Sequence, residues 1–132
     1  MHARLFITLG ALSAGSSVAL GAAASHALAE RLASTLSWFQ TALHYQQFHA
    51  LGLIAVGLLA TRTPSRWVMA SGWLMILGTL LFSGSLYLRS IAGIHDFRAA
   101  TPFGGGTFML AWLALAVGAL MPTANRKGEN HG

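Results

Sequence analysis

The sequence predicts an all-α fold, an integral membrane bundle of four helices, and two observations carry this prediction. Only 8% of the residues are charged and 55% are hydrophobic, whereas about 25% are charged in soluble domains. The charged residues also leave four uncharged stretches, at 5–29, 32–61, 67–88 and 99–125. Each stretch exceeds the roughly 20 residues with which a helix crosses a bilayer. A charge at mid-bilayer costs roughly 2.5–3.5 kcal/mol on insertion scales, so lipid explains this pattern better than a water-soluble core does.

These stretches predict one domain and a tail. We expect a single four-helix transmembrane domain over residues 1–122 and a disordered polar tail over 123–132. The expected helices run at about 5–27, 38–61, 67–88 and 101–121. The chain leaves no room for a soluble catalytic module beside them. Without cysteine it has neither thiol chemistry nor disulfides.

The first helix has two interpretations. Arg4, the apolar run and the small residues before Ser25 resemble a secretory signal with a cleavage site. The uncharged run is longer than a usual signal core, which favours a permanent helix instead. Small residues also recur at helical spacing, which predicts a smooth face that a neighbouring helix can approach closely. They are Gly10, Ala14, Ser17 and Gly21.

The start of the second helix is more polar than its end. Apolar residues fall on one helical face at Leu32, Leu36, Phe39 and Leu43. This pattern predicts a short amphipathic segment at the membrane interface before the crossing. The sequence from Ser37 to Gln40 matches a capping box, so we expect this helix to begin near Trp38.

The third and fourth helices show small residues at similar spacing. Ser71, Gly78 and Ser85 are seven apart in the third, and the fourth has Thr107, Ala111, Ala114 and Gly118. Membrane helices associate through close packing because lipid tails are as apolar as leucine side chains. We therefore expect these faces to pack inside the bundle rather than to line a pore.

The fourth helix opens with an unusual run. Thr101 is expected to be its N-cap, followed by Pro102, which a first helical turn tolerates. Gly104, Gly105 and Gly106 come next. They are expected to let a neighbouring helix approach without side-chain clash. In the alternative, the amides of this helix N-terminus contact a lipid headgroup or a small anion.

The basic residues mark helix ends rather than a binding patch. This spread argues against nucleic acid, which needs a clustered basic surface. If four helices cross, one face carries Arg4, Arg62, Arg66, Arg126 and Lys127. The opposite face carries three cations, Arg31, Arg89 and Arg98, offset by Glu30 and Asp96. The positive-inside rule therefore predicts that both termini are cytoplasmic.

Polar side chains gather at the membrane end away from the termini. The candidate polar site consists of His26, His44, Tyr45, Gln47, His49, Ser83, Ser85 and Tyr87. Polar groups inside a bilayer are costly and raise a site hypothesis by default. The alternative is that these histidines form hydrogen bonds between helices. His44 and His49 lie about 140° apart around a helix, so they cannot grip one ion together, and we expect no metal and no cofactor.

Several motifs in order make a family resemblance specific. They are Gly21-Ala22 with Ser25-His26, the run from Thr41 to Leu51, Gly72-Trp73-Leu74, the run from Leu81 to Tyr87, and Thr101 to Gly105. Together they resemble the uncharacterised small membrane protein family that includes bacterial YgdD and YwdK and animal transmembrane protein 256. The resemblance covers nearly the whole chain and departs at Ser25, where the family often has alanine. It implies a four-helix protein of the bacterial inner membrane and no established activity.

Three functions remain open. The first is a non-enzymatic accessory or assembly subunit that packs against a larger membrane complex, with lipid and other membrane subunits or itself as partners. The second is a binding or transport element for a small lipid-like or quinone-like molecule at the histidine-rich end. The third is a haem or metal protein. We do not expect an enzyme, because the sequence shows no nucleophile with a base and an orienting group.

Overall fold

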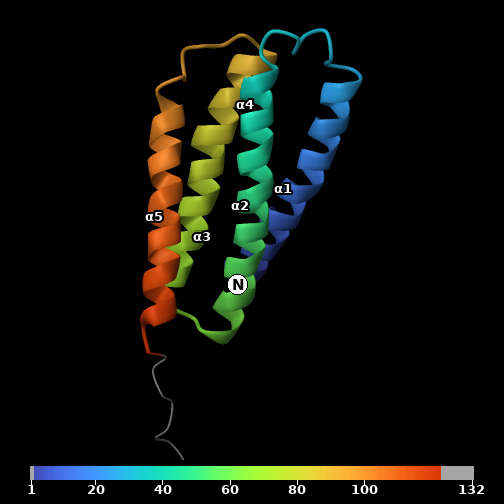
Figure 1. Cartoon of the computed structure of the whole chain (residues 1–132). Coiled ribbons are helices and arrows are strands. Elements are labelled where there is room, and N and C mark those ends of the chain that lie inside the picture. The colour runs from blue at the N-terminus through green and yellow to red at the C-terminus, as the bar shows by residue number, and fades with distance from the viewer. Residues whose placement is uncertain (1, 123–132) are drawn as a thin grey trace, which may run out of the picture.

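The computed structural model describes residues 2–122, and within them every regular element is helical (Figure 1). The elements are α1 (His2–Ser25), α2 (Leu36–Arg62), α3 (Arg66–Gly78), a π-helical turn η1 (Thr79–Ser83), α4 (Gly84–Ile91) and α5 (Ala100–Leu120). Because α3, η1 and α4 continue one another as a 26-residue helix, the described chain forms four long rods. The predicted all-α fold of four helices is confirmed, and the expected tail at 123–132 lies outside the described residues.

Three of the four rods are long and apolar enough to cross a membrane. They are His2–Ser25, Arg66–Ile91 and Ala100–Leu120. The fourth, α2, has 27 residues but is not among them, because its first half is rich in polar side chains. Of these, Gln46 and His49 are buried against neighbouring helices, whereas His44, Tyr45 and Gln47 are exposed.

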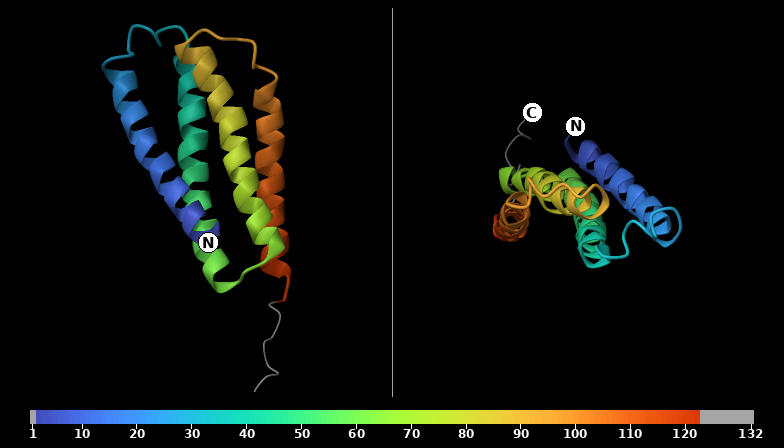
Figure 2. Two further views of the ribbon diagram at one scale, coloured as in Figure 1. Left: turned by 180° about the vertical axis from the view of Figure 1, so that it is seen from behind. Right: turned by 90° about the horizontal axis from the view of Figure 1, so that it is seen from above.

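The helices are arranged as a zigzag row rather than a closed square. Viewed from above, the order is α1, α2, the rod from α3 to α4, and α5 (Figure 2). Among the described elements α1 packs mainly on α2, and α5 packs mainly on α3 and η1. The backbones of α2 and α5 have at most marginal contact. Two helices at the ends of the row thus keep most of their surface outward.

Two helix starts differ from the sequence prediction. Thr35, not Ser37, holds the N-cap position of α2, and no side chain caps that end. The predicted capping box is wrong because the Thr35 hydroxyl donates to the Ser90 carbonyl at 2.8 Å, a tertiary bond that competes with local capping. Ala99, not Thr101, precedes α5. A hydrogen bond to Ser85 at 2.6 Å engages Thr101 instead.

The segment before α2 also differs from the expected amphipathic helix. Residues 26–35 form consecutive turns, and the helix begins at Leu36. Leu32 and Phe39 are buried as their shared face predicts, but Leu36 remains 41% exposed. Turns do not keep helical spacing, so the face expected from the sequence breaks at this point.

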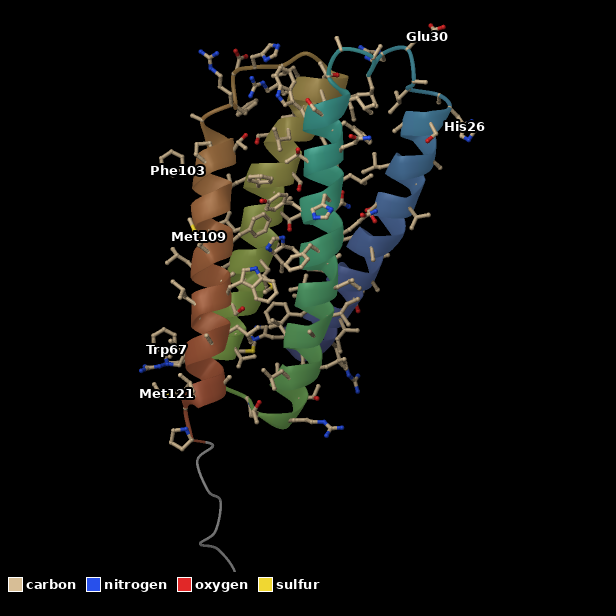
Figure 3. The ribbon with its side chains drawn as sticks, in the orientation of Figure 1. His26, Glu30, Trp67, Phe103, Met109 and Met121 are labelled. Carbon is tan, nitrogen blue, oxygen red and sulfur yellow. The ribbon has the colours of Figure 1, made fainter. Side chains whose placement is uncertain are left out.

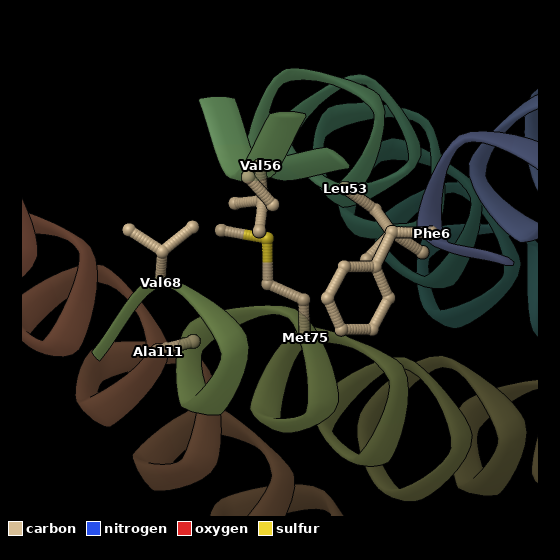
Figure 4. Packing of buried hydrophobic residues seen from close by; sticks show 7 residues of the cluster. Phe6, Leu53, Val56, Val68, Met75 and Ala111 are labelled. Atoms are coloured by element: carbon tan, nitrogen blue, oxygen red, sulfur yellow. The ribbon is translucent and has the colours of Figure 1, made fainter. Parts of the chain in front are cut away.

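The core lies between α1, α2, α3 and α5. Figure 4 shows this packing between the helices, formed by Phe6, Leu53, Val56, Val68, Met75 and Ala111. Phe6 from α1 lies against Gly72 of α3, where an added Cβ atom would come within 2.4 Å of the phenyl ring. The aromatic ring therefore occupies space that only a glycine leaves open.

Two glycines let α1 and α2 approach closely. A Cβ atom on Gly10 would lie 2.9 Å from the Ala50 carbonyl oxygen, and one on Gly57 would lie 2.9 Å from the Ala3 carbonyl oxygen. The two contacts mirror each other across the antiparallel pair. The smooth face predicted for the first helix is therefore confirmed at Gly10, and it is used inside the chain.

We predict that Gly10→Leu destabilises the protein, because the leucine must push α1 away from the α2 backbone. The expected loss is about 1–3 kcal/mol in the free energy of unfolding, measured by titration with a denaturing detergent. Gly15→Leu is the matched control, since a Cβ atom there meets nothing within 4 Å. Equal stability of the two variants would contradict the close approach.

Candidate functional site

The polar residues of α2 lie on the same stripe as its apolar core. The buried positions alternate by three and four residues, the spacing of one helical face: Phe39, Ala42, Gln46, His49, Leu53, Val56 and Ala60. Gln46 and His49 are therefore turned toward neighbouring helices, with only 6% and 3% of their surface exposed. This heptad-like pattern was visible in the sequence, yet the sequence prediction selected Gln47, which is exposed, instead of Gln46.

Gln46 joins three helices. Its side-chain amide nitrogen donates to the Ser13 carbonyl at 3.0 Å and to the Ser16 hydroxyl at 3.0 Å, both on α1. Its amide oxygen accepts from the Tyr87 hydroxyl of α4 at 2.5 Å. Both ends of the buried amide are thus satisfied within the chain, as a polar group in a lipid-embedded bundle requires.

His49 links α2 to α5. The indole N–H of Trp112 donates to His49 Nε2 at 3.0 Å, so Nε2 carries no proton. The proton therefore resides on Nδ1, which donates to the Tyr45 carbonyl at 2.8 Å. The ring also stacks on Phe108, with centroids 3.5 Å apart and an interplanar angle of 9°. Both nitrogens of the neutral ring are occupied, and His49 has no lone pair left for a metal or a haem iron.

The π-helical turn η1 changes the register of the third rod. Before it, buried residues recur at Val68, Ser71, Met75 and Gly78. After it the buried residues are Ser83, Ser85, Leu86 and Ser90, of which Ser83, Leu86 and Ser90 lie one residue later than the same spacing predicts. A π turn inserts one residue into a helix, which accounts for the shift. Without it, position 89 would take the inward place of Ser90.

This shift leaves Arg89 half-buried at the side of the rod, and its Nε is buried without a hydrogen-bond partner among the described residues. Its guanidinium lies 3.9 Å from the centroid of the Trp38 ring, in a cation–π contact near the membrane end. In the same region the Arg31 Nε donates to the Ile91 carbonyl at 2.7 Å. Two of the three cations at this end are therefore engaged in structural contacts.

Hydroxyl groups around η1 form further ties between helices. Ser83 is buried and donates to the Ala42 carbonyl of α2 at 2.8 Å. Ser85 donates to the Phe82 carbonyl at 2.9 Å, so the Thr101 hydroxyl donates to Ser85. The structure thus assigns Ser83, Ser85 and Thr101 to contacts between helices.

A groove lies between α2 and α5, with η1 as its floor. We call it the lateral groove, and its volume is about 540 Å³. Its lining contains five aromatic residues, two histidines, two glycines and two other residues: Tyr45, Phe48, Phe82, Phe108, Trp112, His44, His49, Gly105, Gly106, Pro102 and Met109. None of these residues is charged, so the groove offers a neutral aromatic surface.

The structure divides the predicted polar site among several places. His44, Tyr45 and His49 line the lateral groove, whereas Tyr87 belongs to the Gln46 tie. His26 is exposed in the connection after α1, apart from the other candidates (Figure 3). No three histidine, aspartate or glutamate side chains within residues 2–122 are grouped closely enough to hold a metal ion.

The glycine run of α5 serves two neighbours. A Cβ atom on Gly104 would lie 2.5 Å from the Phe82 backbone nitrogen, so this glycine permits the close approach of η1 that the sequence predicts. Gly105 and Gly106 line the lateral groove instead. Since α5 begins at Ala100, the amides of all three glycines lie past its first turn and are used within the helix. They are not free to contact a headgroup.

These features define a class of protein: a small all-helical protein with several apolar, membrane-length helices joined by buried hydrogen bonds. A family model described as a protein of unknown function, DUF423, matches residues 20–105. The chain belongs to the DUF423 family.

Curated relatives cover most of the chain. The inner membrane protein YgdD of Escherichia coli K12 is 36% identical over 132 residues, covering 99% of both chains. YwdK of Bacillus subtilis 168 is 40% identical over 125 residues, covering 89% of this chain and 97% of its own. A membrane protein of Haemophilus influenzae is 44% identical over 114 residues, covering 86% and 91%. No solved structure matches the fold. The predicted family is confirmed, and with it a membrane protein that has transmembrane helices.

We predict that Gln46 and Tyr87 are energetically coupled. Gln46→Leu leaves a buried tyrosine hydroxyl unpaired, and Tyr87→Phe leaves the amide oxygen unpaired, so each variant is expected to lose about 1–3 kcal/mol of stability. The double variant should lose less than the sum, by about 0.5–2 kcal/mol, measured by detergent unfolding. Strict additivity would show that this contact contributes nothing. Gln47→Leu, an exposed neighbour, is the control and should be nearly neutral.

Proposed function

We propose that the protein is a multi-pass protein of the bacterial inner membrane that acts as a non-enzymatic accessory or assembly subunit. The observation that carries this proposal is the use of its buried polar groups. Gln46, His49, Ser83 and Ser85 all bond to other parts of the same chain. These groups hold helices together and are not left free to act on a substrate, so the outer helix faces are what the protein offers to a partner.

The row arrangement supports a partner at α1. Only 17% of the residues in the most apolar stretch of α1 are buried, the lowest share among the three membrane-length helices. Its outer face presents Leu12 and Val18, which are 65% and 70% exposed. In a closed bundle a helix this apolar would have two neighbours. A membrane helix of another subunit would complete its packing.

The topology within this proposal has both termini in the cytoplasm. Arg4, Arg62 and Arg66 lie toward the end of the molecule where α1 begins and α5 ends, while Arg31 and Arg89 lie at the opposite end. An excess of lysine and arginine in short loops favours the cytoplasmic side. The other two cations of this count, at positions 126 and 127, lie outside the described residues.

We predict that a green fluorescent protein fused to the C-terminus fluoresces in the bacterial cell, because this protein folds to a fluorescent form in the cytoplasm. Alkaline phosphatase at the same position should be inactive. Active phosphatase together with a dark fluorescent protein would place the termini outside and overturn the topology.

We predict that the protein, extracted from its own membranes in mild detergent, retains a larger membrane partner in native mass spectrometry. Val18→Trp should reduce the retained partner at least severalfold, because a bulky ring on the outer face of α1 blocks helix contact while remaining compatible with lipid. Leu120→Trp is the control, since Leu120 is 85% exposed at the far end of α5. Failure to retain any partner, or equal retention in both variants, would contradict a subunit role through α1.

A further inference from the structure

The lateral groove presents exposed aromatic rings. Tyr45 is 39% exposed, Phe48 56% and Trp112 36%, whereas His49 and Phe108 are each 3% exposed and stack on one another with centroids 3.5 Å apart. Exposed aromatic faces favour offset stacking with a planar conjugated ligand. A volume of about 540 Å³ lies within the usual range for small-molecule pockets, roughly 300–1,000 Å³.

The lateral groove opens sideways, between α2 and α5. These helices have at most marginal backbone contact, so their side chains alone separate the groove from its surroundings. Gly105 and Gly106 remove two side chains from the α5 wall, and a Cβ atom on Gly106 would meet nothing within 4 Å. A molecule dissolved in the bilayer can therefore enter the groove laterally.

Two polar groups of the groove have no partner within the described chain. The His49 nitrogens are both occupied, but the Tyr45 hydroxyl and the His44 ring make no hydrogen bond with residues 2–122. Both can donate a hydrogen bond to an acceptor oxygen. They line the groove more than two turns into α2, which begins at Leu36. Their position suits a ligand whose oxygen-bearing ring reaches this depth and whose tail lies in lipid.

The charge of the lining narrows the ligand class. No lysine, arginine, aspartate or glutamate lines the groove. A phosphate placed there would be an uncompensated charge in a low-dielectric site, which is costly. The ligand that matches the groove is therefore neutral, flat and equipped with acceptor oxygens.

The floor of the groove is an irregular helical segment. Phe82 belongs to η1, and its ring centroid lies 4.4 Å from that of Tyr45. The close approach of Gly104 to the Phe82 backbone holds this ring in place between α2 and α5. π turns recur at functional sites in helical proteins. The π turn that shifts the register of the third rod thus also forms the floor of the lateral groove.

We propose that the lateral groove binds an isoprenoid quinone, a neutral planar ring with carbonyl oxygens and an apolar tail. The ring stacks against the exposed ring of Tyr45, and one carbonyl accepts a hydrogen bond from the Tyr45 hydroxyl or the His44 ring. The site is a binding site without a chemical step, and it goes beyond the subunit role because it concerns a different face of the molecule.

The test uses the full chain in phosphatidylcholine nanodiscs and a 1,4-benzoquinone with a decyl chain as the probe. Trp112 lines the groove, so bound quinone is expected to quench part of the tryptophan fluorescence saturably, above the linear quenching by quinone dissolved in lipid. Gly106→Leu fills the groove without meeting a neighbour and should weaken saturable binding at least about tenfold. Tyr45→Phe keeps the ring but removes the donor and should weaken it roughly 3- to 10-fold.

Gly15→Leu is the matched control for the glycine variant, since it adds the same side chain on open space of α1. It should bind as the unchanged protein does. The absence of a saturable component, or equal binding by Gly106→Leu and Gly15→Leu, would overturn the proposal. Native mass spectrometry provides a second, independent measurement of what the groove binds. A phospholipid that is retained in stoichiometric amount and lost in Gly106→Leu would assign the groove to phospholipid and would likewise overturn the quinone assignment.

Discussion

The structure depends on the burial of two polar side chains, Gln46 and His49, on one face of α2. A polar group between membrane helices must find partners inside the protein, because lipid offers none. Gln46 takes its partners from α1 and α4, and His49 takes Trp112 from α5. The second bond links α2 directly to α5, which otherwise packs mainly on α3 and η1. Two side chains of α2 therefore make hydrogen bonds to each of the other rods.

The π turn resolves a conflict within the third rod. A regular helix would direct position 89 inward, and a buried guanidinium would need a charged partner that the neighbouring helices do not offer. One inserted residue turns Ser90 inward and leaves Arg89 against the face of Trp38. The same turn presents Phe82 to the lateral groove and Ser83 to the Ala42 carbonyl. The π turn thus sets the register of the buried face and also contributes a ring to the lateral groove.

Two groups of polar side chains organise the functional proposals. Gln46, His49, Ser83 and Thr101 tie helices together, which is why a subunit role through outer faces is proposed. Tyr45 and His44 have no such partners and face a neutral aromatic groove, which is why a planar ligand is proposed there. Membership of the DUF423 family is consistent with either role, because that family is described as one of unknown function.

Composition and charge spacing by themselves determined the helical class and the four rods, because the cost of charge in lipid acts residue by residue along the chain. The small-residue stripes likewise predicted the close contact at Gly10. Only the tertiary structure decided which polar residues are buried, where Thr35 and Thr101 bond, and how the third rod changes register. Whether Gln46 or Gln47 is buried, and whether Ser90 or Arg89 faces inward, depends on contacts with helices that are distant in sequence. Such choices follow from the relative rotation of packed helices, and no local pattern contains that rotation.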